Sequence, residues 1–391
     1  MRSTTTSLFV FCSCLLAIIV VSACKQSSTS PTPVDASAIT LQWHRAFDGE
    51  TEDQIETGLK WTFLNLGAEL PQGSFSKSSK WLDGNKIQIN FSGLGFSDSA
   101  MQAITSLNTY LKNSQEYKIN KAFDIGKYVM LTMNSSYHYY SITGAPDNLL
   151  EYRRQFAFDQ KFAAILESTV AVGGRLIELP DASDADPLHA SFIAHTGSGD
   201  IGKNAFVIGE YETIQLMHNG QFRFAIYDTS GKLVPSSNTA YSTAGKPSKC
   251  MWCHEINLQP THAATTNASS TYYTFTEFNN LVGKWAASTS SYRSAMHQDV
   301  DFTRIRDHSF SELLYITFME PSAQRLASEW KMSITDVKTR LSRFATHRNT
   351  EHAGLGEAYN RADIDFLSPF PTLKFPSSAR EYSAFEPQYI Q

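Results

Sequence analysis

The chain is poor in cysteine and in charge, and it contains a single long hydrophobic run. Five of its 391 residues are cysteine, 18% are charged, and the formal net charge is −5. Because the basic residues form no block, nucleic acid is not expected as a partner. Hydrophobic residues make up 42% of the sequence, a share that excludes a disordered chain and supplies a large core.

The hydrophobic run spans residues 8–21 and follows Arg2. It is too short, and too close to the first residue, to be a membrane-spanning helix. It leads into Val-Ser-Ala-Cys at residues 21–24, a pattern that resembles the lipobox of bacterial lipoproteins. The resemblance implies that residues 1–23 are a signal peptide and that Cys24 is acylated after cleavage.

Acylation of Cys24 implies a lipid anchor in the cell envelope, because each buried methylene adds about 0.8 kcal/mol to membrane binding. Lys25 stands where an acidic residue often marks retention in the inner membrane, so the outer membrane is favoured. Residues 24–40 are rich in Ser, Thr and Pro and predict a flexible tether. An ordinary signal peptide cut near Ala23 is the alternative.

The rest of the chain predicts an α+β fold. Residues 41–235 combine helical and strand patterns, with a mixed part over 41–150 followed by a β-rich part over 151–235. Residues 236–391 are mainly helical after a loop-like stretch over 236–270. We therefore expect an N-terminal α+β region followed by a helical domain that carries the chemistry described below.

Periodicity and turn residues locate individual elements. Asn219-Gly220 separates two alternating segments and predicts a β-hairpin, and residues 86–91 alternate like a strand. Ser309 and Glu312 fit a capping box at a helix start. Apolar residues at helical spacing predict helices over 51–67, 97–111, 274–295, 309–319, 321–331 and 333–344.

Two thiols remain once two cysteines leave with the signal peptide and Cys24 takes lipid. They are Cys250 and Cys253, in a compartment that oxidises loose thiols. With His254 they form Cys-Met-Trp-Cys-His, the signature for covalent attachment of c-type haem. Each thiol would form a thioether with one haem vinyl group, and the adjacent histidine would be the proximal iron ligand.

In this motif and the helical stretch after it, the chain resembles monohaem c-type cytochromes. The resemblance implies one covalent haem c in a helical domain over residues 236–391. A thioredoxin-like pair is a weaker interpretation, because loop-forming residues precede Cys250 where that fold needs a strand and a helix start. A structural zinc site would need four ligands, and only His262 stands close enough in sequence to join the motif.

The distal iron ligand is predicted from its distance along the chain and its local context. Met319 is preferred, because it lies at a helix break before Pro321 and such connections can direct a side chain inward. Met296, His297 and His308 are the alternatives. A methionine would raise the reduction potential and a second histidine would lower it.

Three functions fit these patterns. One-electron transfer with a redox partner protein is favoured over catalysis, since no acid–base constellation can be assigned. A haem-dependent, peroxidase-like oxidoreductase with an open distal position is the first alternative. A ligand-binding or sensor lipoprotein, in which residues 41–235 carry the main task, is the second. The glycines of residues 197–202 fit a dinucleotide fingerprint, but a strand-like segment follows them where a helix is required.

Overall fold

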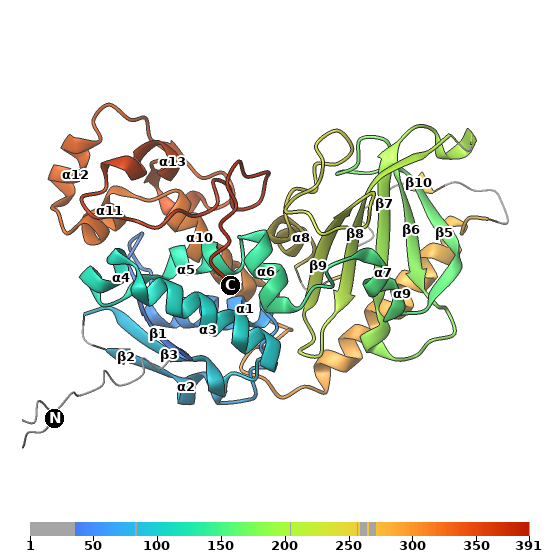
Figure 1. Ribbon diagram of the computed structural model, residues 1–391, viewed down its shortest axis with the longest axis horizontal. Coiled ribbons are helices and arrows are strands. Elements are labelled where there is room, and N and C mark those ends of the chain that lie inside the picture. Colours follow the sequence, from blue (N-terminus) through green and yellow to red (C-terminus); the bar gives the residue numbers. More distant parts are fainter. Residues whose placement is uncertain are drawn as a thin grey trace, which may run out of the picture. The chain divides into compact units, whose positions relative to one another are not determined.

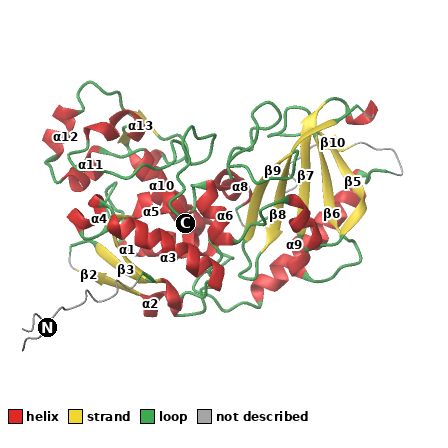
Figure 2. Ribbon diagram, in the orientation of Figure 1, coloured by secondary structure: helices red, strands yellow, loops and turns green. Residues whose placement is uncertain are grey.

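The structure is a computed structural model that describes residues 36–82, 84–203, 205–255, 257–258, 264–265 and 271–390. The predicted signal peptide over 1–23, the acylation site Cys24, most of the 24–40 tether and His262 lie outside the described residues. Figure 1 shows the chain with its elements labelled, and Figure 2 separates helices from strands by colour.

A small mixed sheet and a group of helices form the first part of the chain. The sheet has the order β2-β3-β1-β4, with β1 antiparallel to β3 and parallel to β4. Its strands are β1 (Ala38–Gln42), β2 (Ser79–Leu82), β3 (Lys86–Asn90) and β4 (Phe123–Asp124). The helices are α1 (Glu52–Asn65), α2 (Ser74–Ser78), α3 (Asp98–Asn113), α4 (Gln115–Asn120), α5 (Ile125–Thr132), α6 (Ser136–Thr143) and α7 (Leu149–Arg154).

Local signals explain where α1 begins and which side it buries. The Thr51 side chain accepts a hydrogen bond from the Gln54 backbone, and the Gln54 side chain accepts one from the Thr51 backbone, which makes a capping box. Ile55, Leu59 and Phe63 recur at helical spacing and are fully or almost fully buried. The predicted helix over 51–67 is therefore confirmed.

A six-stranded antiparallel sheet occupies the middle of the chain, in the order β10-β5-β6-β7-β8-β9. Asn219-Gly220 turns the chain between β8 and β9, as predicted, and Gly220 has a φ of +79° that favours glycine. The Asn219 amide donates to the carbonyls of Leu64 and Ala68, which fixes the turn to the end of α1. The strands are β5 (Phe158–Glu167), β6 (Arg175–Pro180), β7 (Ser191–Ser198), β8 (Val207–Leu216), β9 (Phe222–Asp228) and β10 (Ala264–Thr265).

Helices dominate the C-terminal part, and the α+β class is confirmed. The predicted loop over 236–270 is wrong in two respects, because residues Pro247–His254 form helix α8 and Ala264–Thr265 form strand β10. Pro247 at the first helical position was the available signal. Ser309 does not cap its helix, since His308 is the N-cap residue and makes no side-chain cap. The other helices are α9 (Phe275–Ser294), α10 (Ser309–Met319), α11 (Ala323–Trp330), α12 (Ile334–Arg340) and α13 (Arg361–Ile364).

The helices after residue 236 pack in two places. Helix α9 lies along the six-stranded sheet, and Lys161 of β5 forms a 3.6 Å ion pair with Glu277 of α9. Helix α10 packs instead against α1 and α5. The approach is close, because a Cβ added at Gly58 would lie 2.7 Å from the Phe310 carbonyl oxygen. Contacts therefore cross the predicted boundary at residues 235–236, and Ala36–Gln391 forms one unit.

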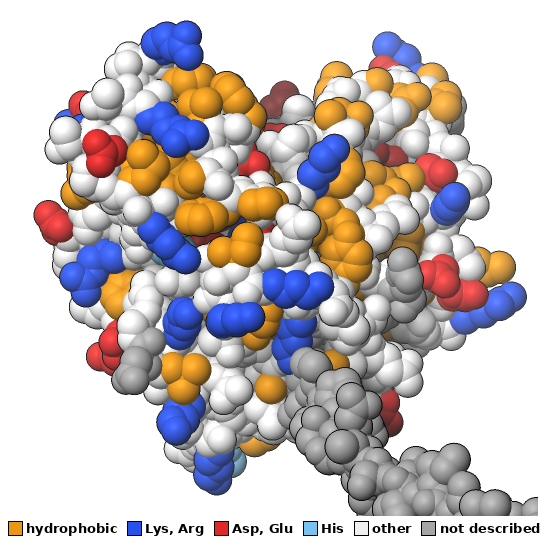
Figure 3. All heavy atoms as spheres, turned by 60° about the vertical axis from the view of Figure 1, so that its left-hand side comes forward, with side chains coloured by type: hydrophobic (Ala, Val, Ile, Leu, Met, Phe, Trp, Pro, Cys, Tyr) orange, Lys and Arg blue, Asp and Glu red, His pale blue; other side chains and the backbone are white. Residues whose placement is uncertain are grey.

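The surface mixes cationic and apolar side chains. On the face shown in Figure 3, Lys and Arg side chains are spread among hydrophobic and uncharged ones. Among the described residues, no helix combines the length and the apolar character that crossing a membrane requires.

Candidate functional site

Helix α8 places the three motif residues on one side. Cys250, Cys253 and His254 are spaced i, i+3 and i+4, so their side chains share a helix face. The helix begins after Lys246, whose backbone is extended, and ends at Glu255, whose φ of 49° stops further helical winding. The sequence thus builds a two-turn helix that presents two thiols and an imidazole on one face.

That face of α8 lines a cavity between the six-stranded sheet and α9. The cavity encloses about 180 Å³, and all three motif residues contribute to its wall. Drug-sized ligands occupy cavities of roughly 300–1,000 Å³, so a larger planar group would be only partly enclosed here. The apolar wall comes from four strands and α9 and consists of Ile177, Phe192, Ile214, Phe224, Phe278 and Val282.

Charged side chains stand at one edge of this apolar cavity. Arg175 of β6 donates to both carboxylate oxygens of Glu212 on β8, at 2.8 and 2.7 Å. Both residues line the cavity, and the Arg175 Nε is buried without a hydrogen-bond partner among the described residues. Lys249 also lines the cavity, and its Nζ donates to Glu381 at 2.6 Å and to the Thr243 carbonyl at 2.7 Å. The Arg175 Nε is therefore the donor at this cavity that has capacity for a ligand carboxylate or carbonyl.

The His254 ring is held against the sheet. Its centroid lies 5.7 Å from that of Phe224, and burial lowers its pKa while the nearby Asn257 backbone opposes the shift. Its Nδ1 is buried and has no partner with normal hydrogen-bond geometry within the described residues. A neutral imidazole that lines a cavity is a suitable metal ligand.

The two thiols are not activated as nucleophiles. Burial raises the pKa of Cys250 well above its usual range, and burial also raises the pKa of Cys253. Reactive cysteines of redox pairs have the opposite shift, which a helix N-terminus or a nearby cation produces. Cys250 is the fourth residue of α8 and does not open the helix. The geometry therefore does not favour a thioredoxin-like pair.

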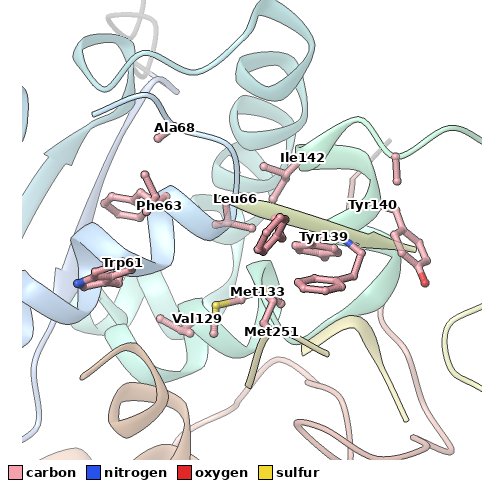
Figure 4. Close-up of a cluster of buried hydrophobic side chains, with 14 of the residues drawn as sticks. Trp61, Phe63, Leu66, Ala68, Val129, Met133, Tyr139, Tyr140, Ile142 and Met251 are labelled. Atoms are coloured by element: carbon pink, nitrogen blue, oxygen red, sulfur yellow. Dashed lines mark hydrogen bonds between the residues drawn. The ribbon is translucent and has the colours of Figure 1, made fainter. Parts of the chain in front are cut away.

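The two residues between the cysteines point away from the cavity. Met251 is buried, and Figure 4 shows it in a cluster that includes Met133 and Tyr139. Trp252 lies beneath the Arg380 guanidinium, whose carbon is 4.3 Å from the indole centroid. Helix α8 is thus fixed on two sides while its third side faces the cavity.

The predicted distal ligands lie elsewhere in the described chain. His308 contacts Glu255 and Glu312 at 3.4 and 3.5 Å, beside the end of α8. Met319 is the last residue of α10 and packs on the main core. The described residues that line the cavity include none of the four candidates, so the distal ligand stays a prediction.

The other two candidates lie beyond the far end of the sheet. A Cβ added at Gly220 would lie 2.9 Å from the Met296 sulfur, which places Met296 at the turn between β8 and β9. The His297 carbonyl accepts a 3.1 Å hydrogen bond from the Gln72 backbone.

The sequence did not reveal the sheet's contribution to the site. Arg175 and Glu212 carry charges at strand positions that face the cavity, and a charge on the buried face of a strand is the signal that could have found them. No group of three or more His, Cys, Asp or Glu side chains in the described residues is arranged to hold a metal ion. Comparisons of the chain with protein-family models, curated proteins and solved structures gave no match.

Proposed function

We propose that the chain binds one haem c covalently through Cys250 and Cys253, with His254 as the proximal iron ligand. The observation that carries this proposal is the shared wall: both thiols and the imidazole line the same apolar cavity. The donor set fits the group, because the two sulfurs and one nitrogen lie on a single helix face next to aromatic and aliphatic side chains. The Arg175 Nε, which is buried without a partner among the described residues, could donate to a carboxylate of such a macrocycle.

The attachment step needs no external oxidant. The thiols of Cys250 and Cys253 would each add S–H across one vinyl double bond, with the sulfur bonded to one carbon and the hydrogen to the neighbouring carbon. When bound, haem supplies reversible one-electron chemistry at iron. The chain holds the imidazole against Phe224 and surrounds the site with apolar side chains, which control solvent access and thereby the reduction potential.

One-electron transfer at the cell envelope is the physiological role that we propose. A protein partner would donate or accept the electron, and the acyl group on Cys24 would hold the chain at a membrane, the outer membrane being favoured. The raised thiol pKa values support this role over thiol chemistry, since neither cysteine is prepared to act as a thiolate.

A specific observation also favours the alternative, a haem-dependent oxidoreductase. The described residues lining the cavity include no methionine and no histidine other than His254. A haem held by His254 alone among these residues would be able to bind a small ligand. Carbon monoxide separates the two roles: rapid binding to the reduced protein supports the oxidoreductase, and no binding supports electron transfer.

The proposal is tested with protein made together with a cytochrome c maturation system. A denaturing gel stained for haem should show a coloured band for the wild-type chain and for the control Met251→Leu. The double variant C250A/C253A should show none, because it lacks both thioether bonds. A colourless wild-type band under these conditions would refute covalent attachment.

A further inference from the structure

The C-terminal residues 377–389, called the strap below, contact helix α8 along its first turns, and Glu381 forms a 2.6 Å ion pair with Lys249. The Lys246 backbone N–H donates to the Arg380 carbonyl at 2.8 Å, immediately before the helix. Two residues later the Ser248 hydroxyl donates to the Ala379 carbonyl. The strap therefore meets the helix at its first turn, where backbone groups lack helical partners.

A buried ion pair fixes the same end of α8. Lys246 Nζ is bonded to a Glu386 carboxylate oxygen, and the two side chains are 0% and 6% exposed. Glu386 also accepts a 3.2 Å hydrogen bond from the Ser136 backbone at the start of α6. The Tyr389 backbone donates to His138 of α6 at 2.7 Å. The strap thus joins the helix that carries the motif to the N-terminal part of the fold.

Arg380 joins the strap to α10 as well. Its guanidinium covers the Trp252 ring and donates to the Tyr315 hydroxyl at 2.8 Å. It also donates to Glu351 at 2.7 Å and to Glu312 of α10 at 3.3 Å. Because the planar Arg380 guanidinium has this many partners, it holds the Trp252 indole in place, and with it the helical turn between Cys250 and Cys253.

We propose that Arg380 is a positioning residue of the site, through which the strap holds α8 at a fixed distance and angle from the sheet. The proposal goes beyond haem binding, since it concerns how firmly the helix is held. It rests on the proposed function only for the measurement of a reduction potential, which requires bound haem. Because the iron ligand His254 is the last residue of the same helix, loosening the first two turns changes the environment of that imidazole.

The experiment compares Arg380→Met with Arg304→Met. Arg304 is an exposed arginine whose ion pair is with Asp307, three residues away, so it controls for the loss of a surface charge. Amide hydrogen exchange of the full-length chain without haem is the first measurement. Arg380→Met should raise exchange in α8 about tenfold, the factor that one charge-assisted hydrogen bond contributes to a local opening equilibrium, and should leave α1 unchanged. Arg304→Met should change neither helix.

The reduction potential of the haem-loaded protein is the second measurement, and Arg380→Met should shift it while Arg304→Met does not. The milder variant Ser248→Ala, which removes one strap contact, should raise α8 exchange by a smaller factor and remains informative if Arg380→Met folds poorly. Unchanged α8 exchange, or an equal rise in α1 and α8, would overturn the proposal. If the wild-type chain takes no haem, the haem assignment fails while the exchange measurement still decides the role of the strap.

Discussion

Two buried arginines, each paired with a glutamate, differ in how many of their guanidinium nitrogens have hydrogen-bond partners. Arg361 of α13 donates through Nε to the Phe318 carbonyl and through its two terminal nitrogens to Glu329, at 2.8 and 2.6 Å. Arg175, at the cavity, uses one terminal nitrogen for both oxygens of Glu212, and its Nε has no partner among the described residues. The Arg361–Glu329 pair joins three helices with all its guanidinium nitrogens bonded. The Arg175–Glu212 pair leaves one donor without a partner beside the cavity.

The nearby carboxylates show the same contrast. Burial alone would raise the pKa of Glu329, but the Arg361 guanidinium lowers it to about 2. Burial raises the pKa of Glu210, with help from the neighbouring charge of Glu212, to about 7. At the junction of α10, α11 and α13, the Glu329 carboxylate is therefore paired with a guanidinium. Glu210 stands two residues before the cavity-lining Glu212 on β8, so two carboxylates lie near the Arg175 guanidinium. A carboxyl with a raised pKa beside a cavity is typical of functional sites.

The largest expected effect is the loss of Arg361. Arg361→Met leaves the Glu329 carboxylate buried without its main partner, and we expect it to lower the free energy of unfolding by about 3–5 kcal/mol. Arg175→Met should cost less, about 1–3 kcal/mol, because Glu212 keeps a 3.0 Å hydrogen bond from Ser242. Urea denaturation at neutral pH measures both. Equal losses in the free energy of unfolding would show that the two ion pairs contribute equally and would contradict the difference described above.

Two helical glycines differ in the space around them, and replacing each with alanine tests that difference. A Cβ at Gly126 in α5 would overlap the Leu314 carbonyl and the Phe318 side chain of α10, so Gly126→Ala should destabilise the fold by about 1–3 kcal/mol. Gly283 in α9 is exposed to solvent and has nothing within 4 Å of that position. Gly283→Ala should stabilise by about 0.5–1 kcal/mol, the usual gain from replacing a helical glycine. Thermal unfolding of both variants gives the signs, and destabilisation by Gly283→Ala would contradict the open surroundings of that residue.

The last expected effect vanishes at low pH and appears only as pH rises. A carboxyl whose folded-state pKa is raised contributes stability below its unfolded value, and that contribution is lost as pH rises through the folded value. For Glu210 the loss falls between about pH 4.5 and pH 7. Glu210→Gln mimics the protonated group, so it should match wild type near pH 4.5 and exceed it by about 1–2 kcal/mol at pH 8. A stability difference that does not change between these pH values would exclude a raised pKa at Glu210.

The sequence predicted elements better than it predicted the site. The capping residue Thr51 and the Asn219-Gly220 turn act on their immediate neighbours, so α1 and the β8–β9 hairpin could be located from local patterns. The motif residues Cys250 and His254 were found because their spacing is itself the signal. The cavity could not be found, since its wall combines residues of β6, β7, β8, β9 and α9 whose proximity depends on register and packing.

The same limit applies to helix α8. Its Pro247 start was readable, but nothing near the motif shows that a sheet would lie on one side of it and residues 377–389 on another. Those contacts join residues far apart in the sequence, and local patterns carry no information about such pairs. The assignment of distal candidates by chain distance shares this weakness, because a suitable separation does not direct a side chain to the cavity.

The ion pair between Lys246 and Glu386 spans 140 positions of the chain. Synthesis proceeds from the N-terminus, so α8 emerges well before the residues that hold it. Contacts between distant positions also form slowly, because a long loop must close first. Until residues 377–389 have folded onto it, helix α8 lacks the contacts that hold its first turn. Docking of these residues is therefore expected to be a late step in folding the site.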